Sequence, residues 1–79
     1  MTESSSLQEP FRATVTALQG RGKARYAVTE RGGVSVTFTL KPSVWDYPRE
    51  PIVGEEVELS QVFKTPRGFR ANLSRQILA

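Results

Sequence analysis

The chain has 79 residues and a net charge of +3, with neither cysteine nor histidine. This length allows one domain, and the composition excludes disulfides, the usual zinc sites and histidine-activated nucleophiles. We therefore expect a binding domain that holds no metal and no cofactor and is not an enzyme. No apolar run approaches the roughly 20 residues that span a bilayer, and residues 1–9 lack the regions of a signal peptide. A cytoplasmic protein that does not bind a membrane is the expectation.

Residues 1–10 are rich in serine and glutamate and predict a disordered N-terminal tail, which leaves residues 11–79 for the folded domain. The first strand is predicted from Phe11, because apolar and polar residues alternate there with a period of two. Its inward row is expected to be Phe11, Ala13, Val15 and Ala17. Gly20 and Gly22 then indicate a turn.

A second strand is predicted over about residues 23–30. We expect Tyr26 and Val28 to face inward, and Arg25, Ala27 and Thr29 to face outward. Two glycines at 32–33 indicate a hairpin. The third strand alternates most strictly and is rich in β-branched residues, which favours a strand over a helix. Its inward row is Val34, Val36, Phe38 and Leu40, and its outward row is Ser35, Thr37 and Thr39.

Residues 41–54 form a long connection in which three prolines exclude a regular strand or a long helix. A single turn is expected around residues 43–46, with Ser43 as a candidate N-cap. The apolar side chains of this connection are predicted to plug one end of a barrel: Val44, Trp45, Tyr47 and Ile52.

A fourth strand is predicted after Gly54, with Val57 and Leu59 inward and an extension, through a candidate bulge, toward Phe63. The last strand covers about residues 69–77. Its inward residues are expected to be Ala71 and Leu73, and its outward residues Arg70, Asn72 and Ser74. Five short strands with one long connection predict an all-β protein, a small five-stranded antiparallel OB-type barrel with a long plug between strands three and four. An SH3-like barrel is the alternative.

Charge is unevenly distributed along the chain. Residues 10–41 hold six bases and one acid, residues 42–58 hold five acids and one base, and residues 59–79 hold four bases and no acid. Such segregation indicates a basic face, which is typical of proteins that bind polyanions. The alternative is that these charges only solvate the surface.

Three stretches resemble the second half of cold-shock domains: residues 34–38, 53–59 and 67–73. Over residues 11–77 the chain is also similar to bacterial translation initiation factor one, a single OB domain. The resemblance implies an OB fold and nucleic-acid binding. Cold-shock domains stack bases on outward aromatic residues, and the matching positions here hold Arg25, Ala27, Ser35 and Thr37. The resemblance therefore implies binding through basic and hydroxyl side chains without that stacking platform.

Arginine dominates the bases, and its planar fork suits phosphate groups. The candidate nucleic-acid-binding residues are Arg12, Arg21, Lys23, Arg25, Arg31, Ser35, Thr37 and Arg70. Trp45 and Tyr47 are candidates for stacking or docking, unless they are buried in the plug. We expect the partner to be RNA or single-stranded DNA, free or within a ribonucleoprotein. The alternative is a protein–protein interaction module that docks through the aromatic plug or an edge strand.

Overall fold

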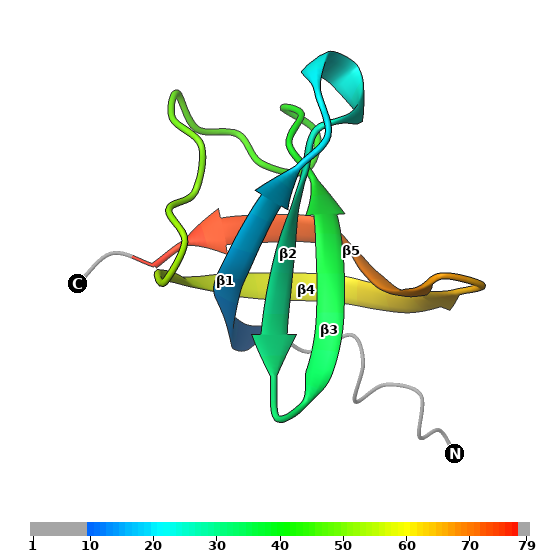
Figure 1. The fold of residues 1–79 in the computed structure, drawn as a ribbon. Helices are drawn as coiled ribbons and strands as arrows, with labels where there is room; N and C mark the ends of the chain where they lie inside the picture. Colours follow the sequence, from blue (N-terminus) through cyan, green and yellow to red (C-terminus); the bar gives the residue numbers. More distant parts are fainter. Residues whose placement is uncertain (1–9, 78–79) are drawn as a thin grey trace.

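The computed structural model describes residues 10–77, which form five strands and one short 3-10 turn (Figure 1). The elements are β1 (Phe11–Gln19), η2 (Gly22–Ala24), β2 (Tyr26–Arg31), β3 (Val34–Thr39), β4 (Glu56–Thr65) and β5 (Gly68–Gln76). The strands close into a barrel in the order β1-β2-β3-β5-β4, so the predicted all-β barrel is confirmed, and the architecture is consistent with an OB-like fold. The predicted tail, apart from Pro10, lies outside the described residues.

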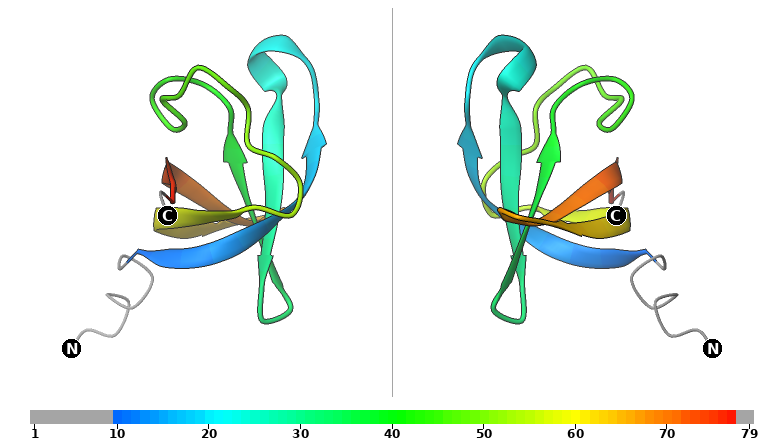
Figure 2. Two further views of the ribbon diagram at one scale, coloured as in Figure 1. Left: turned by 90° about the vertical axis from the view of Figure 1, so that its left-hand side faces the viewer. Right: turned by 90° about the vertical axis from the view of Figure 1, so that its right-hand side faces the viewer.

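The sheet is mixed rather than fully antiparallel, so this part of the prediction is wrong. Successive strands alternate in direction, and β1 pairs with both β2 and β4. Closure of the barrel places β5 beside β3. Because successive strands alternate in direction, the third and fifth strands run the same way, and they pair in parallel. Figure 2 shows the β4–β5 pair crossing the layer formed by β1, β2 and β3. No helix within residues 10–77 is long and apolar enough to cross a membrane.

The barrel interior contains most of the inward residues expected from β1, β3 and β4, among them Val15, Phe38 and Leu59. The inward placement of Val34 is wrong: this first residue of β3, beside the β2–β3 turn, is 46% exposed. The assignment of β2 is inverted: Ala27 and Thr29 are completely buried, whereas Tyr26 and Val28 lie on the outer side. Cross-strand partners point to the same side of a sheet. Phe38 lies opposite Ala27, and the small alanine leaves room for the phenylalanine ring.

Thr29 is tolerated inside because its hydroxyl is satisfied. Its Oγ1 donates a hydrogen bond of 2.7 Å to the carbonyl oxygen of Val36, its cross-strand partner. A buried hydroxyl without a partner would cost free energy, so this bond explains how a polar residue occupies the interior. In β1, the register shifts between Val15 and Ala17, and Leu18 packs against the core while Ala17 is half-buried.

In both β4 and β5 the alternation of inward and outward side chains shifts by one residue, and the two shifts lie at the same level of the hairpin. In β4 the buried residues pass from Leu59 to Val62, and Gln61 between them has a positive φ of 54°. In β5 the buried residues are Ala71 and Ser74, so the inward placement of Leu73 is wrong, and this side chain is 41% exposed. The predicted continuation of the fourth strand is confirmed, because β4 extends to Thr65.

The long connection packs on the barrel without forming a helix between β3 and β4. Its turn lies over residues 42–44, where the Lys41 carbonyl accepts hydrogen bonds from the backbone N–H groups of Val44 and Trp45, so Ser43 caps no helix. Ser74 donates to the Val44 carbonyl through both its backbone N–H and its hydroxyl, which explains its burial. Ile52, predicted as part of the plug, is 59% exposed.

Trp45 of this connection belongs to the hydrophobic core, and Val44 and Tyr47 pack against it. Trp45 is only 4% exposed, and its ring centroid lies 5.8 Å from that of Phe38 and 4.6 Å from that of Tyr47. Its indole N–H donates to the Arg49 carbonyl at 2.7 Å. The indole therefore stabilises the fold by burying a large apolar surface, and its buried N–H has a hydrogen-bond partner.

Candidate nucleic-acid interface

The outer face of β2, β3 and β5 is continuous, and cross-strand pairing defines its rows. Val28 lies opposite Thr37, and Thr37 lies opposite Arg70 on the parallel strand β5. In the neighbouring outward row, two residues away along each strand, Tyr26 of β2 lies opposite Thr39 of β3. The Arg70 side chain crosses to β3, where its Nη2 donates to Thr39 Oγ1 at 2.6 Å. This bond holds the guanidinium of a β5 residue over the neighbouring strands.

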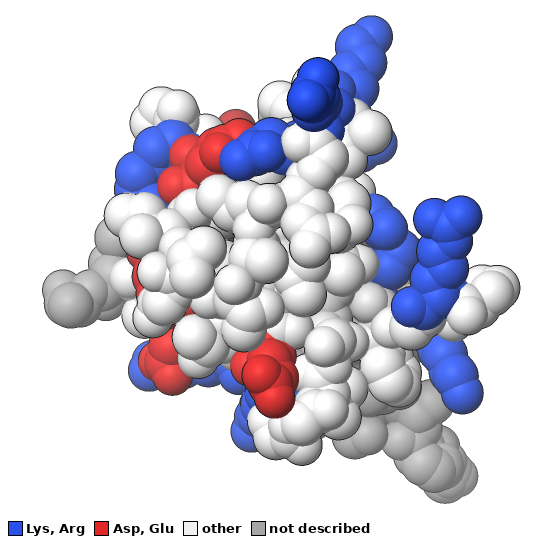
Figure 3. Space-filling view, in the orientation of Figure 1, with Lys and Arg blue, Asp and Glu red and all other residues white. Residues whose placement is uncertain are grey.

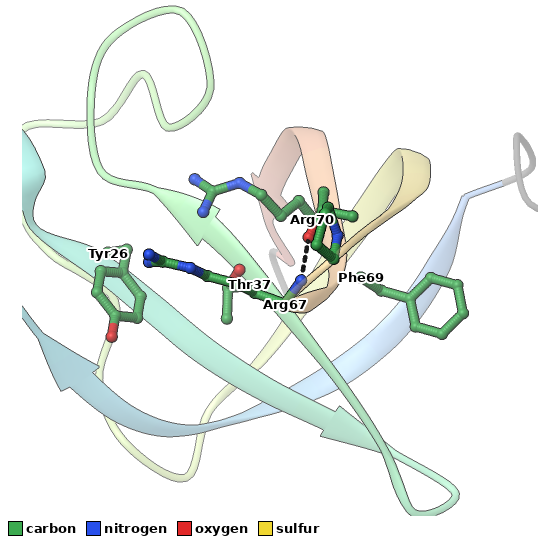
Figure 4. A pocket seen from close by; sticks show the side chains of 7 residues that line it. Tyr26, Thr37, Arg67, Phe69 and Arg70 are labelled. Carbon is green, nitrogen blue, oxygen red and sulfur yellow. Dashed lines mark hydrogen bonds between the residues drawn. The ribbon is translucent and has the colours of Figure 1, made fainter.

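A pocket of about 440 Å³ lies between this face and the β4–β5 turn. Its lining residues are Tyr26, Thr37, Thr65, Pro66, Arg67, Phe69 and Arg70. Figure 4 shows the Arg67 side chain extending across the pocket toward Tyr26, whereas the Phe69 ring points away from it. The pocket therefore brings two guanidinium groups close to one aromatic ring.

Local hydrogen bonds explain why the turn and the ring hold these positions. The Thr65 hydroxyl donates to the Gly68 carbonyl at 2.7 Å and accepts from the Arg67 backbone N–H at 3.1 Å. On β2, the Tyr26 hydroxyl donates to Gln19 Oε1 at 2.7 Å. A hydroxyl that bridges both ends of a short turn fixes its shape, so Arg67 is presented from a rigid hairpin.

Basic side chains without acidic neighbours gather at the top of the surface shown in Figure 3, over the β1–β2 connection, and at the right, around the β4–β5 turn, whereas those at the left lie beside acidic groups. The outer face of the strands between the top and right groups is largely uncharged. Within residues 10–77, neither Arg67 nor Arg70 forms an ion pair. Both guanidinium groups therefore keep their charge available for an anionic ligand.

Arg25, a predicted phosphate ligand, is instead bound to an acid of the long connection. Its Nε and Nη2 donate to the two carboxylate oxygens of Glu50 at 2.5 and 3.1 Å, and its Nη1 donates to the Gly20 carbonyl at 3.0 Å. Hydrogen bonding to Glu50 raises the pKa of Arg25. This fork-to-fork geometry uses the same donors that a phosphate would need.

The Arg49–Glu55 pair repeats this arrangement within the long connection. Arg49 donates through Nη1 and Nη2 to the Glu55 carboxylate at 3.2 and 3.1 Å, and the Ile52 backbone N–H donates to Glu55 Oε1 at 2.7 Å. The hydrogen bond from Arg49, followed by that from Ile52, lowers the pKa of Glu55. The same hydrogen bonding, in which Arg49 donates and Glu55 accepts, raises the pKa of Arg49.

Three predicted residues lie away from the pocket. Arg12 is on β1, opposite Glu58 of β4. The Arg31 guanidinium lies over the Phe11 ring, 5.2 Å from its centroid, and Ser35 is opposite Glu30 near the β2–β3 turn.

Arg21 and Lys23 are exposed on the β1–β2 connection, which leads directly into Tyr26. Lys41 joins them, because the backbone N–H of Leu40 donates to the Arg25 carbonyl and brings the end of β3 beside this connection. Of the eight predicted residues, the pocket itself contains Thr37 and Arg70.

Sequence reasoning missed Tyr26, Arg67 and Phe69 as lining residues of the pocket. Tyr26 was placed inside the barrel, and the signal that could have corrected this is the pairing of β2 with β3: an interior Phe38 favours the small Ala27 opposite it. Trp45 is buried and Tyr47 half-buried, so neither presents a fully free ring.

Residues 10–77 contain no group of three or more acidic, histidine or cysteine residues that could hold a metal ion. Compared with known proteins, the chain matches no protein-family model and no curated protein.

Proposed function

We propose that this domain binds single-stranded nucleic acid, RNA or single-stranded DNA, on the outer face of β2, β3 and β5. The observation that carries the proposal is the pocket in which Arg67 and Arg70 lie beside Tyr26. Guanidinium groups bind phosphates through paired hydrogen bonds, and a tyrosine ring supports a stacked base. These are the two contacts that single-strand binding requires.

The uncharged part of the face favours a single strand over a duplex. Thr37 and Thr39 place hydroxyl groups on this face, Thr37 opposite Arg70 and Thr39 opposite Tyr26, where they can donate to bases or sugars. Unpaired bases expose their rings and edges to such a surface, whereas paired bases do not. Phosphates would lie at the basic margins of the face and bases across its centre.

In this proposal the domain binds a free strand or a strand within a ribonucleoprotein in the cytoplasm, and it catalyses no reaction. Because phosphate contacts position a protein without reading sequence, the arginines alone give a general affinity. Two observations favour nucleic-acid binding over the protein-docking alternative. Trp45, the larger ring of the aromatic plug, is buried, and the five described strands close into a barrel.

The test is a titration of a labelled oligonucleotide of about 12 nucleotides, within the range of OB site sizes, at several salt concentrations. The wild-type domain should bind at low salt, and the logarithm of its affinity should fall linearly with the logarithm of salt. Replacing Arg67 and Arg70 together with alanine should weaken binding and flatten that slope by roughly one to two units, as expected for two lost phosphate contacts.

The matched control is the Arg12→Ala, Arg75→Ala double variant, which loses the same charge. Both residues lie opposite Glu58 in the β1–β4–β5 ladder, away from the pocket. This variant should keep most of the affinity. No binding at low salt, or equal losses in the two double variants, would refute the proposed interface.

A further inference from the structure

The outer row that contains Arg70 continues past β5 onto β4. Arg70 lies directly opposite Phe63 in the β4–β5 ladder, so the row runs from Val28 through Thr37 and Arg70 to Phe63 across four strands. Phe63 is 41% exposed, although large aromatic side chains are usually buried in so small a domain. The proposed nucleic-acid face therefore ends on a second aromatic ring.

A shallow groove of about 480 Å³ adjoins this ring, lined by Gln61, Val62, Phe63 and Asn72. It has no charged lining residue. Gln61 and Asn72 are exposed, and neither makes a side-chain hydrogen bond within the described part of the chain. Two unengaged carboxamides thus lie beside an exposed aromatic ring.

The backbone at Gln61 adds an independent observation. Its φ of 54° lies in the left-handed region, where a residue with a side chain is uncommon and strained. This conformation accompanies the shift of alternation in β4, which turns Val62 into the core and leaves Gln61 on the groove. An asparagine or glycine would take the same backbone at lower cost, so the backbone conformation does not explain why this residue is a glutamine.

We propose that this groove is a base-reading subsite that prefers adenine, which gives the domain a sequence preference beyond its general affinity. The inference rests on the proposed nucleic-acid function. Phe63 stacks on the base, and the amides of Gln61 and Asn72, which approach from β4 and β5, bind its edges. Unstacked bases of single strands are recognised in this way, by an aromatic ring together with hydrogen bonds along their edges.

The pair of amides selects adenine by hydrogen-bond matching. Each carboxamide presents one acceptor oxygen and one donor NH₂ side by side. Adenine offers a matching donor and acceptor on both of its edges, N6 with N7 and N6 with N1. Guanine presents two acceptors, N7 and O6, on the corresponding outer edge, and a pyrimidine has one pairing edge. Only adenine satisfies both amides at once.

The experiment compares oligouridine strands of equal length that carry, at their centre, a short run of adenine, inosine, cytosine or uracil. The wild-type domain should bind the adenine strand about tenfold more tightly than the others, a discrimination within the range of a good bidentate contact. Replacing the adenines with 7-deazaadenine, which lacks the N7 acceptor, should remove most of this preference.

The variants are Gln61→Gly, which removes the amide and favours the same positive φ, and Asn72→Ala. Each should reduce the adenine preference severalfold and leave the salt slope unchanged, because neither changes the charge. Phe63→Ala should weaken binding to all four strands. Arg70→Ala is the control, and it should lower affinity for all strands alike and flatten the salt slope. Both amides are exposed, so thermal unfolding should show folded variants.

The outcomes separate this subsite from the function on which it rests. Salt-dependent binding with no adenine preference would overturn the subsite alone. A preference that survives in the Gln61→Gly, Asn72→Ala double variant would do the same. Absence of binding to every strand would overturn the proposed function and the subsite with it.

Discussion

The arginines of the long connection and its surroundings differ from those of the β4–β5 hairpin, although the residue type is the same. Arg25 and Arg49 each form a bidentate ion pair with a carboxylate of the connection. Arg67 and Arg70 form no ion pair within residues 10–77, and both line the pocket on the outer face. The first pair has a structural role, and the second is available to a ligand.

The distribution of acids explains this difference. Residues 42–58 contain five acids, and the connection brings Glu50 and Glu55 within reach of nearby arginines. Residues 59–79 contain none, so the segment that holds Arg67 and Arg70 has no acid of its own to neutralise these bases. The absence of nearby acids is thus a better guide to which arginines stay unpaired than the number of bases in a segment.

The largest expected effect concerns the core on which both regions depend. Phe38→Ala should lower the free energy of unfolding by about 3–5 kcal/mol, because it empties a fully buried site beside Trp45. A domain of this size has little stability to lose, so chemical denaturation should show a largely unfolded variant. Thr37→Ala, the neighbouring outward residue, should change stability by no more than about 0.5 kcal/mol. Equal losses would contradict the assignment of faces on β3.

The two neighbouring strands show how far alternation can predict a fold. In β3, large β-branched and aromatic residues occupy only one row, so a single assignment was consistent with the sequence, and the structure confirms it for Val36 and Phe38. In β2 both rows are mixed. Tyr26 and Val28 are the more apolar row, but the narrow interior beside Phe38 accepts the smaller Ala27 and Thr29. The space available inside the small barrel determines which row of β2 faces inward, and the amino-acid composition of the strand does not report that space.

The candidate site was predicted less well than the fold for a related reason. Thr37 was selected through the cold-shock resemblance and Arg70 as an outward base of the last strand, and both line the pocket. Arg25 was selected by its neighbours in sequence, and its ion pair with Glu50 spans 25 positions. Arg67 was not selected, because its role depends on a turn that folds back toward Tyr26. Contacts between distant segments determine which charges are free, and no local pattern reports them.

The second prediction concerns the β1–β2 connection, in which the Gly20 carbonyl accepts a hydrogen bond from Arg25. Gly20→Ala should lower the free energy of unfolding by about 1–3 kcal/mol. Gly20 has a φ of +83°, and an added Cβ would lie 2.4 Å from the Ala24 carbonyl oxygen. Gly22→Ala is the matched control, since its φ is also positive but no atom lies within 4 Å of the added Cβ. Its cost should therefore be smaller. Equal unfolding midpoints in urea would show that the connection yields to the added methyl group.

The third prediction tests the comparison of arginines directly. Arg25→Ala should lower the unfolding temperature and change oligonucleotide affinity little, because its guanidinium is already bound to Glu50 and Gly20. Arg67→Ala should leave the unfolding temperature nearly unchanged and weaken binding severalfold, with a salt slope flatter by about 0.7, the value for one phosphate on a single strand. Thermal melts and salt titrations of both variants provide the measurement. The reverse pattern would show that the two groups of arginines have been assigned to the wrong roles.

The smallest effect concerns the Arg49–Glu55 pair and its dependence on pH. Hydrogen bonds from Arg49 and the Ile52 backbone lower the pKa of Glu55 in the folded state, while the unfolded chain keeps the usual value near 4.3. A lowered pKa means that the pair contributes its full stability above the unfolded pKa and loses it as pH falls through the folded one. Glu55→Gln should therefore be less stable than the wild type at about pH 6 and approach it below about pH 4. Urea unfolding at both pH values measures the difference.

Glu56→Gln controls for the loss of a negative charge, because Glu56 is exposed and forms no ion pair among residues 10–77. A gap between Glu55→Gln and the wild type that stays constant with pH would show that the ion pair adds nothing to the folded state.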